Sequence, residues 1–94
     1  MFIRIAGDVI FRVLGDEAVI LNLATGTYFG LNSVGTRLWQ LIAEHGSVEP
    51  VIAAFLTEYE VEESQLRQDL ADLIQQLVQK GLVSSEAEKT SQAG

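Results

Sequence analysis

The stretch EAVILNLATGTYFGLN, residues 17–32, decides the fold of this chain. Aliphatic and β-branched residues dominate residues 18–23, and Thr, Tyr, Phe and Leu dominate residues 27–31, so both segments favour β-strands. Between them, Gly26 can adopt the positive φ that a short hairpin loop usually needs. The stretch therefore predicts a β-hairpin. Its second strand is the last of the sheet, because the chain after Asn32 has helical periodicity.

One further strand is predicted before the hairpin. Residues 9–14, VIFRVL, lie between two glycine-aspartate pairs, and Gly15-Asp16 suits a turn into the next strand. Residues 2–5 form either an extension of this strand or a separate short strand. The N-terminal third therefore predicts a three-stranded antiparallel meander whose last strand, residues 27–31, leaves backbone N–H and C=O groups unpaired along one edge.

Three helices are predicted after the sheet. Asn32 can cap the first helix with its side chain, and Gly46 ends that helix. Ser47 is the expected cap of the second helix. The third helix begins between residues 61 and 65, and Gly81 suits the left-handed position that ends many helices.

The third helix carries an apolar arc of about 160°, which is wider than packing on a single neighbour requires. Three strands cannot bury their apolar side chains alone, so the helices should cover one face of the sheet. The wide arc is then expected to serve both the core and a second purpose. Its members are Leu66, Leu70, Ala71, Leu73, Ile74, Leu77 and Val78.

The expected fold class is α+β and winged-helix-like, with a three-stranded antiparallel sheet followed by three helices. Residues 1–83 are expected to form this single domain, since 94 residues suffice for one hydrophobic core. Residues 84–94 contain no bulky apolar residue and are expected to be a disordered polar tail.

Composition limits the classes of function. The chain has no Cys, which excludes disulfides, thiolate catalysis and cysteine metal sites and fits a reducing cytoplasm. No apolar stretch reaches the roughly 18 residues of a membrane span, and the N-terminus does not resemble a signal peptide. We therefore expect a cytoplasmic protein with no membrane partner.

The net charge of −7 is placed unevenly. Residues 1–41 contain three basic and three acidic residues, whereas residues 42–94 contain three basic and ten acidic residues. Neutralisation of phosphates dominates affinity for nucleic acids, so a helical half that repels phosphate is a poor binder of DNA or RNA. No nucleic-acid partner is expected.

A catalytic site does not assemble from the residues present. The only His, His45, precedes Gly46 at the end of a helix, where an exposed imidazole near the negative end of the helix dipole is the simpler interpretation. No Ser lies in a nucleophile-elbow pattern. We predict no enzyme activity, no cofactor and no metal. A solvated surface, rather than a cation or partner site, is expected for Glu58, Glu60, Glu62 and Glu63.

Taken together, the segments resemble the PqqD-like family, whose small domains are known as RiPP recognition elements. The resemblance covers residues 8–83, and its most specific part is DEAVILNLATGTYFGLNSVG, residues 16–35. The helix containing Leu38-Trp39, the segment from Val48 onward and the closing DLADLIQQLVQKGL, residues 69–82, complete it. The resemblance implies a fold that catalyses no reaction. Such domains bind the leader of a ribosomally made precursor peptide and present it to a separate enzyme.

The resemblance also implies where the peptide binds. The leader adds as a strand beside the last strand of the sheet, and its side chains enter a groove between that strand and the third helix. Because neighbouring strand residues face opposite sides, either Tyr28 or Phe29 forms the sheet wall. The implied strand residues are Thr27, Tyr28, Phe29, Gly30 and Leu31, and the implied helix wall consists of Arg67, Asp69, Leu70, Leu73, Ile74 and Leu77.

The implied partners are a precursor leader peptide and a separate maturation enzyme. A stand-alone domain is similar to those of split lasso-peptide systems, whose enzyme is a cysteine leader peptidase, although other pathways use the same module. Main-chain pairing supplies affinity and side-chain pockets supply selectivity, and the acidic helical half suits a leader carrying Lys or Arg. Replacing Leu70 or Ile74 with Glu should abolish binding while the fold survives.

Two other functions fit parts of the pattern. A winged-helix nucleic-acid binder would need a basic helix or wing, which this chain lacks. A plain assembly module would pair its exposed strand with a second copy and form a weak homodimer.

Overall fold

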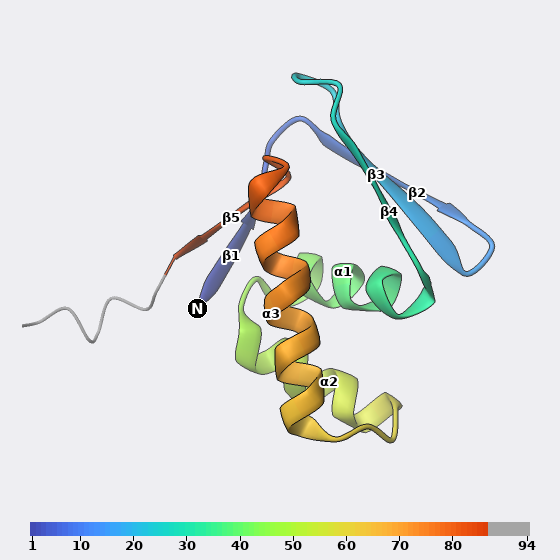
Figure 1. The fold of residues 1–94 in the computed structure, drawn as a ribbon, viewed down its shortest axis with the longest axis vertical. Coiled ribbons are helices and arrows are strands. Elements are labelled where there is room, and N and C mark those ends of the chain that lie inside the picture. Colours follow the sequence, from blue (N-terminus) through green and yellow to red (C-terminus); the bar gives the residue numbers. More distant parts are fainter. Residues whose placement is uncertain (87–94) are drawn as a thin grey trace, which may run out of the picture.

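The computed structural model describes residues 1–86. Figure 1 shows a sheet on one side of the molecule and helices on the other, with a small second sheet beside helix α3. The elements are β1 (Phe2–Ile5), β2 (Val9–Leu14), β3 (Glu17–Asn22), β4 (Tyr28–Leu31), α1 (Ser33–His45), α2 (Val48–Glu58), α3 (Glu63–Gln79) and β5 (Val83–Glu86).

Strands β2, β3 and β4 form the predicted antiparallel meander, in that spatial order. Gly15 has a φ of 69° in the turn between β2 and β3, and Gly26 has a φ of 77° in the hairpin loop. Left-handed backbone is costly for residues with a Cβ, so glycine at both turns fixes where each strand ends. The α+β class and the order of strands before helices are confirmed.

Strand β1 is a separate strand, which decides between the two alternatives for residues 2–5. It pairs with β5 in a second antiparallel sheet, with Ile5 opposite Val83 and Phe2 opposite Glu86. On its other side, the backbone N–H of Ile3 donates to the carbonyl of Gly46 at 2.9 Å. The two ends of the described chain therefore lie side by side (Figure 1).

Strand β5 corrects the predicted boundary at residue 83. The prediction of a disordered tail is wrong for residues 84–86, because they continue the strand, and residues 87–94 lie outside the described residues. The side chains of residues 84–86 are exposed, so the strand has no apolar pattern of its own. Its backbone pairing with β1 and the burial of Leu82 and Val83 hold it in place.

The helix ends follow most of the sequence signals. The backbone N–H of Gly35 donates to Oδ1 of Asn32 at 2.8 Å, which confirms the predicted cap of α1. Gly46 ends α1 and Gly81 has left-handed backbone after α3, both as predicted, and Gly46 is left-handed as well. Ser47 occupies the position before α2, but its side chain makes no capping hydrogen bond, and its backbone bridges to Phe2 of β1.

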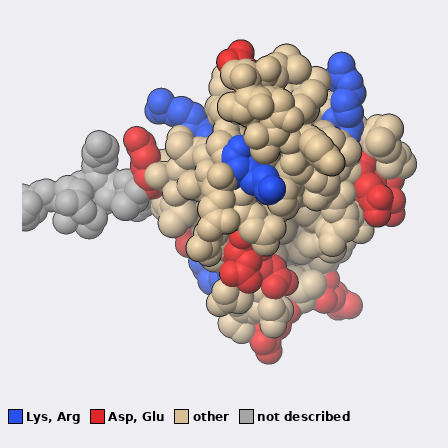
Figure 2. Space-filling model, turned by 45° about the horizontal axis from the view of Figure 1, so that its top comes forward, with Lys and Arg blue, Asp and Glu red and all other residues tan. Residues whose placement is uncertain are grey.

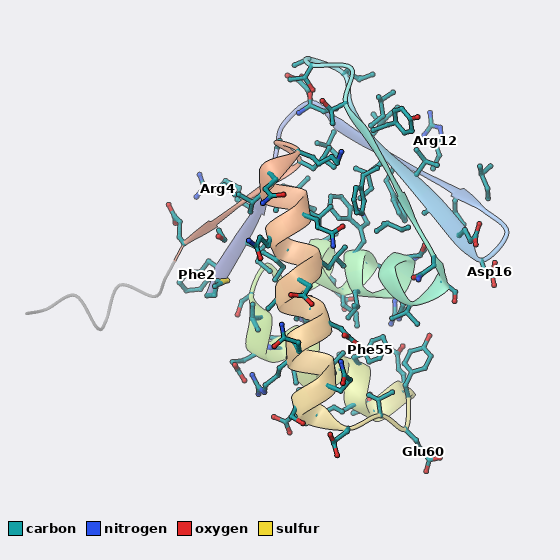
Figure 3. The ribbon with its side chains drawn as sticks, viewed as in Figure 1. Phe2, Arg4, Arg12, Asp16, Phe55 and Glu60 are labelled. Carbon is teal, nitrogen blue, oxygen red and sulfur yellow. The ribbon has the colours of Figure 1, made fainter. Side chains whose placement is uncertain are left out.

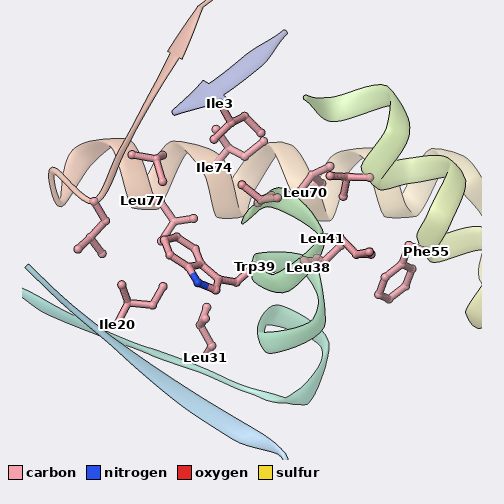
Figure 4. Packing of buried hydrophobic residues seen from close by; sticks show 14 of the residues in the cluster. Ile3, Ile20, Leu31, Leu38, Trp39, Leu41, Phe55, Leu70, Ile74 and Leu77 are labelled. Carbon is pink, nitrogen blue, oxygen red and sulfur yellow. The ribbon is translucent and has the colours of Figure 1, made fainter. Parts of the chain in front are cut away.

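The core lies between the three-stranded sheet and the helices. Figure 4 shows Trp39 of α1 between Leu77 of α3 and the sheet residues Ile20 and Leu31. Ile3 joins the same cluster from β1, so both sheets share one core. In the part of the chain that the structure describes, no helix has the length and apolar character needed to cross a membrane.

Asn22 ties the hairpin loop to the end of α3. Its side chain is buried; Oδ1 accepts hydrogen bonds from the backbone N–H groups of Ala24 and Thr25 at 2.9 and 3.3 Å, and Nδ2 donates to the carbonyl of Gly81 at 3.1 Å. One amide thus satisfies backbone groups from two parts of the chain.

Asn22→Ala is expected to lower the free energy of unfolding by about 1–3 kcal/mol, because it leaves three backbone groups without their partner. Thr25→Ala in the same loop is the control, since its hydroxyl is exposed and accepts only from the N–H of Thr27. Urea unfolding followed by circular dichroism measures both. Equal effects of the two substitutions would contradict the structural role of Asn22.

Candidate functional site

Strand β4 is one of the two edges of the three-stranded sheet within residues 1–86, and β2 is the other. The backbone N–H of Asn22 donates to the carbonyl of Thr27 at 2.8 Å. Hydrogen-bonded and non-hydrogen-bonded pairs alternate along an antiparallel ladder, so Phe29, two residues later, also directs its N–H and C=O toward β3. Tyr28 and Gly30 direct theirs away from β3. The edge therefore offers up to four backbone hydrogen bonds to another strand.

The side chains of β4 alternate between the two faces of the sheet. Phe29 lies opposite the fully buried Ile20 and packs against the core, and Leu31 is buried. Tyr28 faces the other way, with 70% of its surface exposed. Of the two aromatic residues, Phe29 is therefore the one on the side of the helices.

A hollow of about 240 Å³ lies where the end of β4 and the start of α1 approach α3. Figure 1 shows β4 on the side of the sheet nearer to α3. Leu73 of α3 and Leu38 of α1 contribute apolar side chains to the lining of the hollow. The lining residues are Asn32, Val34, Gly35, Leu38, Asp69, Asp72, Leu73 and Gln76.

Gly35 keeps the floor of this hollow close to β4. A Cβ at this position would lie 3.1 Å from Cδ2 of Leu31, closer than ordinary van der Waals contact. A larger residue would require the Leu31 side chain or the first turn of α1 to shift by a few tenths of an ångström. Glycine lowers helix stability by about 1 kcal/mol relative to Ala, and close packing against the sheet explains why it is present here.

The structure divides the predicted helix wall into three parts. Asp69 and Leu73 line the hollow. Leu70, Ile74 and Leu77 are only 1%, 5% and 0% exposed, because they form the core beneath the sheet. The expectation that Leu70→Glu or Ile74→Glu spares the fold conflicts with this burial, since an unpaired buried carboxylate is strongly destabilising.

Arg67, the remaining member of the predicted wall, lies away from the hollow. Its guanidinium donates to Glu49 of α2 at 2.8 and 2.9 Å and to Glu63 of α3 at 2.9 Å. These hydrogen bonds hold the pKa of the Glu49 carboxyl below its usual value. Arg67 borders a different apolar hollow on the opposite flank of α3, between Val48 and Val78. The small exposed parts of Leu70 and Ile74 line this second hollow too, so three residues of the predicted wall meet there.

Sequence reasoning missed six of the lining residues: Asn32, Val34, Gly35, Leu38, Asp72 and Gln76. On α3, Asp69, Asp72, Leu73 and Gln76 are spaced at three and four residues and share one helical face. The spacing was visible in the sequence. The direction in which this face points, however, depends on which neighbouring leucines of α3 are buried in the core.

No metal-binding cluster is present among residues 1–86: no three His, Asp or Glu side chains lie close enough to hold an ion. His45 has Nε2 at 4.0 Å from Glu44 Oε2, on the surface at the end of α1. The site offers backbone hydrogen-bonding groups along β4, apolar side chains and the carboxylates of Asp69 and Asp72.

Comparison with known proteins places this geometry in a family. The family model described as coenzyme PQQ synthesis protein D (PqqD) matches residues 17–83, well over half of the chain. The chain belongs to the PqqD family. The matched segment runs from the start of β3 to the start of β5, so this PqqD-family core contains both β4 and α3. None of the curated proteins compared with this PqqD-family chain matches it.

Two solved structures share the fold of this PqqD-family domain. The structure described as "TbiB1 in Complex with the TbiA(beta) Leader Peptide" is 38% identical, with a TM-score of 0.81, and the match covers 90% of this chain and 99% of that chain. The structure described as "Lasso peptide synthetase B1 complexed with the leader peptide" is 24% identical, with a TM-score of 0.78, over 90% of this chain and 100% of that chain. The predicted resemblance to the PqqD-like family is confirmed.

Proposed function

We propose that this domain recognises the leader segment of a ribosomally made precursor peptide and catalyses no reaction itself. The observation that carries the proposal is the edge of β4, where the N–H and C=O groups of Tyr28 and Gly30 point away from β3, and the chain leads from this strand through Asn32 to the hollow against α3. The 38% identical relative is described as a complex with a leader peptide, which supports the same ligand class here.

The leader is taken up as a fourth strand of the sheet. Main-chain hydrogen bonds to Tyr28 and Gly30 supply affinity that depends little on sequence, and alternate side chains of the leader supply selectivity. Leader side chains opposite Phe29 and Leu31 point toward α3, because opposed residues of neighbouring strands share a face. They meet Leu73 and Leu38 there.

The bound leader is then presented to a separate enzyme. In the split lasso-peptide arrangement that the chain resembles, this enzyme is a cysteine leader peptidase, and we propose such a partner here. Strand addition suits presentation, because it fixes one segment of the precursor and leaves the rest of that peptide free to enter another active site. The proposed place of action is the cytoplasm, where the precursor is made.

A titration monitored by fluorescence anisotropy tests this function. The probes are the labelled TbiA(beta) leader peptide and the labelled leader of any precursor peptide whose gene lies beside the gene of this protein. Wild-type protein is expected to bind at least one of them saturably. Failure to bind either would contradict the proposed function. Self-association through β4 would compete for the same backbone groups, so the titration is repeated at several protein concentrations.

Leu73→Glu is expected to weaken peptide binding by about tenfold or more, because it places a carboxylate in the apolar part of the hollow. Val78→Glu is the matched control. Val78 is on the same helix, 40% exposed, and lines the hollow on the opposite flank. Circular dichroism confirms that both variants fold. Equal losses of affinity in the two variants would rule out the β4–α3 groove as the site.

A further inference from the structure

The hollow in front of α3 carries uncompensated negative charge. Asp69 and Asp72 line it, and no Lys or Arg is among its lining residues. Their hydrogen bonds are with neutral amides: Gln65 donates to Asp69 at 2.9 Å, and Gln68 donates to Asp72 at 3.0 Å.

Three other carboxylates of the helical half, those of Glu49, Glu58 and Glu63, are paired with arginine. Arg37 donates to Glu58, and Arg67 donates to Glu49 and Glu63. Within residues 1–86, neither Asp69 nor Asp72 forms an ion pair. Figure 2 shows acidic side chains gathered over the helical part of the molecule.

The positive end of the α1 dipole offsets this charge only in part. The hollow includes Asn32, Val34 and Gly35 at the start of α1, where a helix carries the equivalent of roughly half a positive charge. The two carboxylates of Asp69 and Asp72 contribute two full negative charges. A partner in this hollow is therefore favoured when it brings a cation.

Strand geometry limits where that cation can be placed. A guest strand on β4 directs every second side chain toward α3. These are the guest side chains opposite Phe29 and Leu31, and the alternate guest side chains that follow beyond Leu31. The lining includes Asn32, directly after Leu31, so the hollow lies at this end of the strand. The acidic pair is next to Leu73 on α3, so one guest side chain can contact Leu73 while another on the same face reaches the carboxylates.

Resting on the proposed function, we propose that the captured segment carries a Lys or Arg that pairs with Asp69 and Asp72. Along the captured peptide, this basic residue is an even number of positions away from an apolar residue, and that apolar residue packs against Leu73 and Leu38. The methylene stem of a Lys or Arg can lie along apolar surface while its charged head reaches the carboxylates. The ligand class is thus a basic-apolar alternating leader segment.

The experiment is selection from a displayed library of random 12-residue peptides against three proteins. These are the wild type, the double variant Asp69→Lys/Asp72→Lys, and the control Glu60→Lys. Glu60 is an exposed carboxylate in the loop between α2 and α3, pointing away from the body of the molecule (Figure 3). All three proteins are checked for native circular dichroism before selection.

The wild type and Glu60→Lys are expected to enrich Lys or Arg at one position, an even number of residues from an enriched apolar position. The double variant should enrich Asp or Glu at that basic position. For a peptide selected by the wild type, affinity should fall about tenfold or more in the double variant, and wild-type affinity should fall as salt increases.

The outcomes separate this inference from the proposed function. The inference alone would be overturned if the selected peptides bind the wild type through the backbone groups of β4 but are not enriched in Lys or Arg. Loss of the basic preference in Glu60→Lys as well as in the double variant would also overturn it, since the effect would then be one of net charge. Absence of any enriched peptide, or enriched peptides indifferent to the β4 edge, would overturn both.

Discussion

Gly30→Pro is expected to reduce leader binding by about a hundredfold or more while leaving the β2–β3–β4 sheet folded. The N–H of Gly30 points away from β3, so proline removes a hydrogen bond to the guest strand and none within the protein. A carbonyl of the guest then loses its donor, which costs about 1–3 kcal/mol, and the proline ring obstructs the approach of the strand.

Gly30→Ala is the matched control for this prediction. A Cβ at Gly30 meets no heavy atom within 4 Å, and alanine keeps the N–H group. Affinity of Gly30→Ala for the leader should therefore stay within a few-fold of the wild type. If proline and alanine have the same small effect in the anisotropy titration, the main chain of β4 does not hold the peptide. Thermal unfolding of both variants shows whether the sheet is intact.

Trp39→Ala should produce the largest loss of stability, about 3–5 kcal/mol in the free energy of unfolding. Trp39 is 3% exposed, and its ring centroid lies 6.1 Å from that of Phe11 on β2. The indole joins sheet and helices, since it lies between Leu77 and the sheet residues of the core (Figure 4). Its removal leaves a cavity between α3 and the sheet, which are the two walls of the proposed peptide site. Peptide affinity should therefore fall together with stability.

Val78→Ala provides the reference for this measurement. Its side chain is 40% exposed, so the substitution should change the free energy of unfolding by less than about 1 kcal/mol. Urea unfolding of the two variants is compared at the same pH and salt. A loss below about 1 kcal/mol for Trp39→Ala would contradict its assignment to the shared core.

Local signals in the sequence predicted the strands and helices well. Positive φ at Gly26, Gly46 and Gly81 depends on the residue itself, because a Cβ disfavours that backbone conformation. The cap at Asn32 likewise needs only a short side chain within reach of the first turn. The start of α3 at Glu63 falls within the predicted range of residues 61–65.

Long-range pairing was not predictable in the same way. Strand β5 reads Val-Ser-Ser-Glu, with no alternation of apolar residues, and it is ordered by backbone pairing to β1 from the other end of the chain. The bridge between Phe2 of β1 and the backbone of Ser47 is another contact between distant parts of the chain. Such partners are invisible in any local window.

The wide apolar arc of α3 was only partly understood from sequence. A second neighbour explains much of its width, because Ile3 of β1, Val83 of β5 and Leu82 directly before β5 belong to the same core. Leu70, Ile74 and Leu77 are consequently used for folding, and the exposed part of the groove comes from the adjoining face around Leu73. A wide arc thus predicts additional contacts without saying whether they are internal or with a ligand.

Residue-resolved amide hydrogen exchange by NMR tests strand addition most directly. In the free protein, the N–H groups of Tyr28 and Gly30 should exchange quickly, whereas those of Phe29 and Leu31 should be protected by β3. Saturation with leader peptide is predicted to slow exchange at Tyr28 and Gly30 by at least about tenfold. Unchanged exchange at both residues, with new protection on another surface such as the hollow beside Val78, would contradict the account.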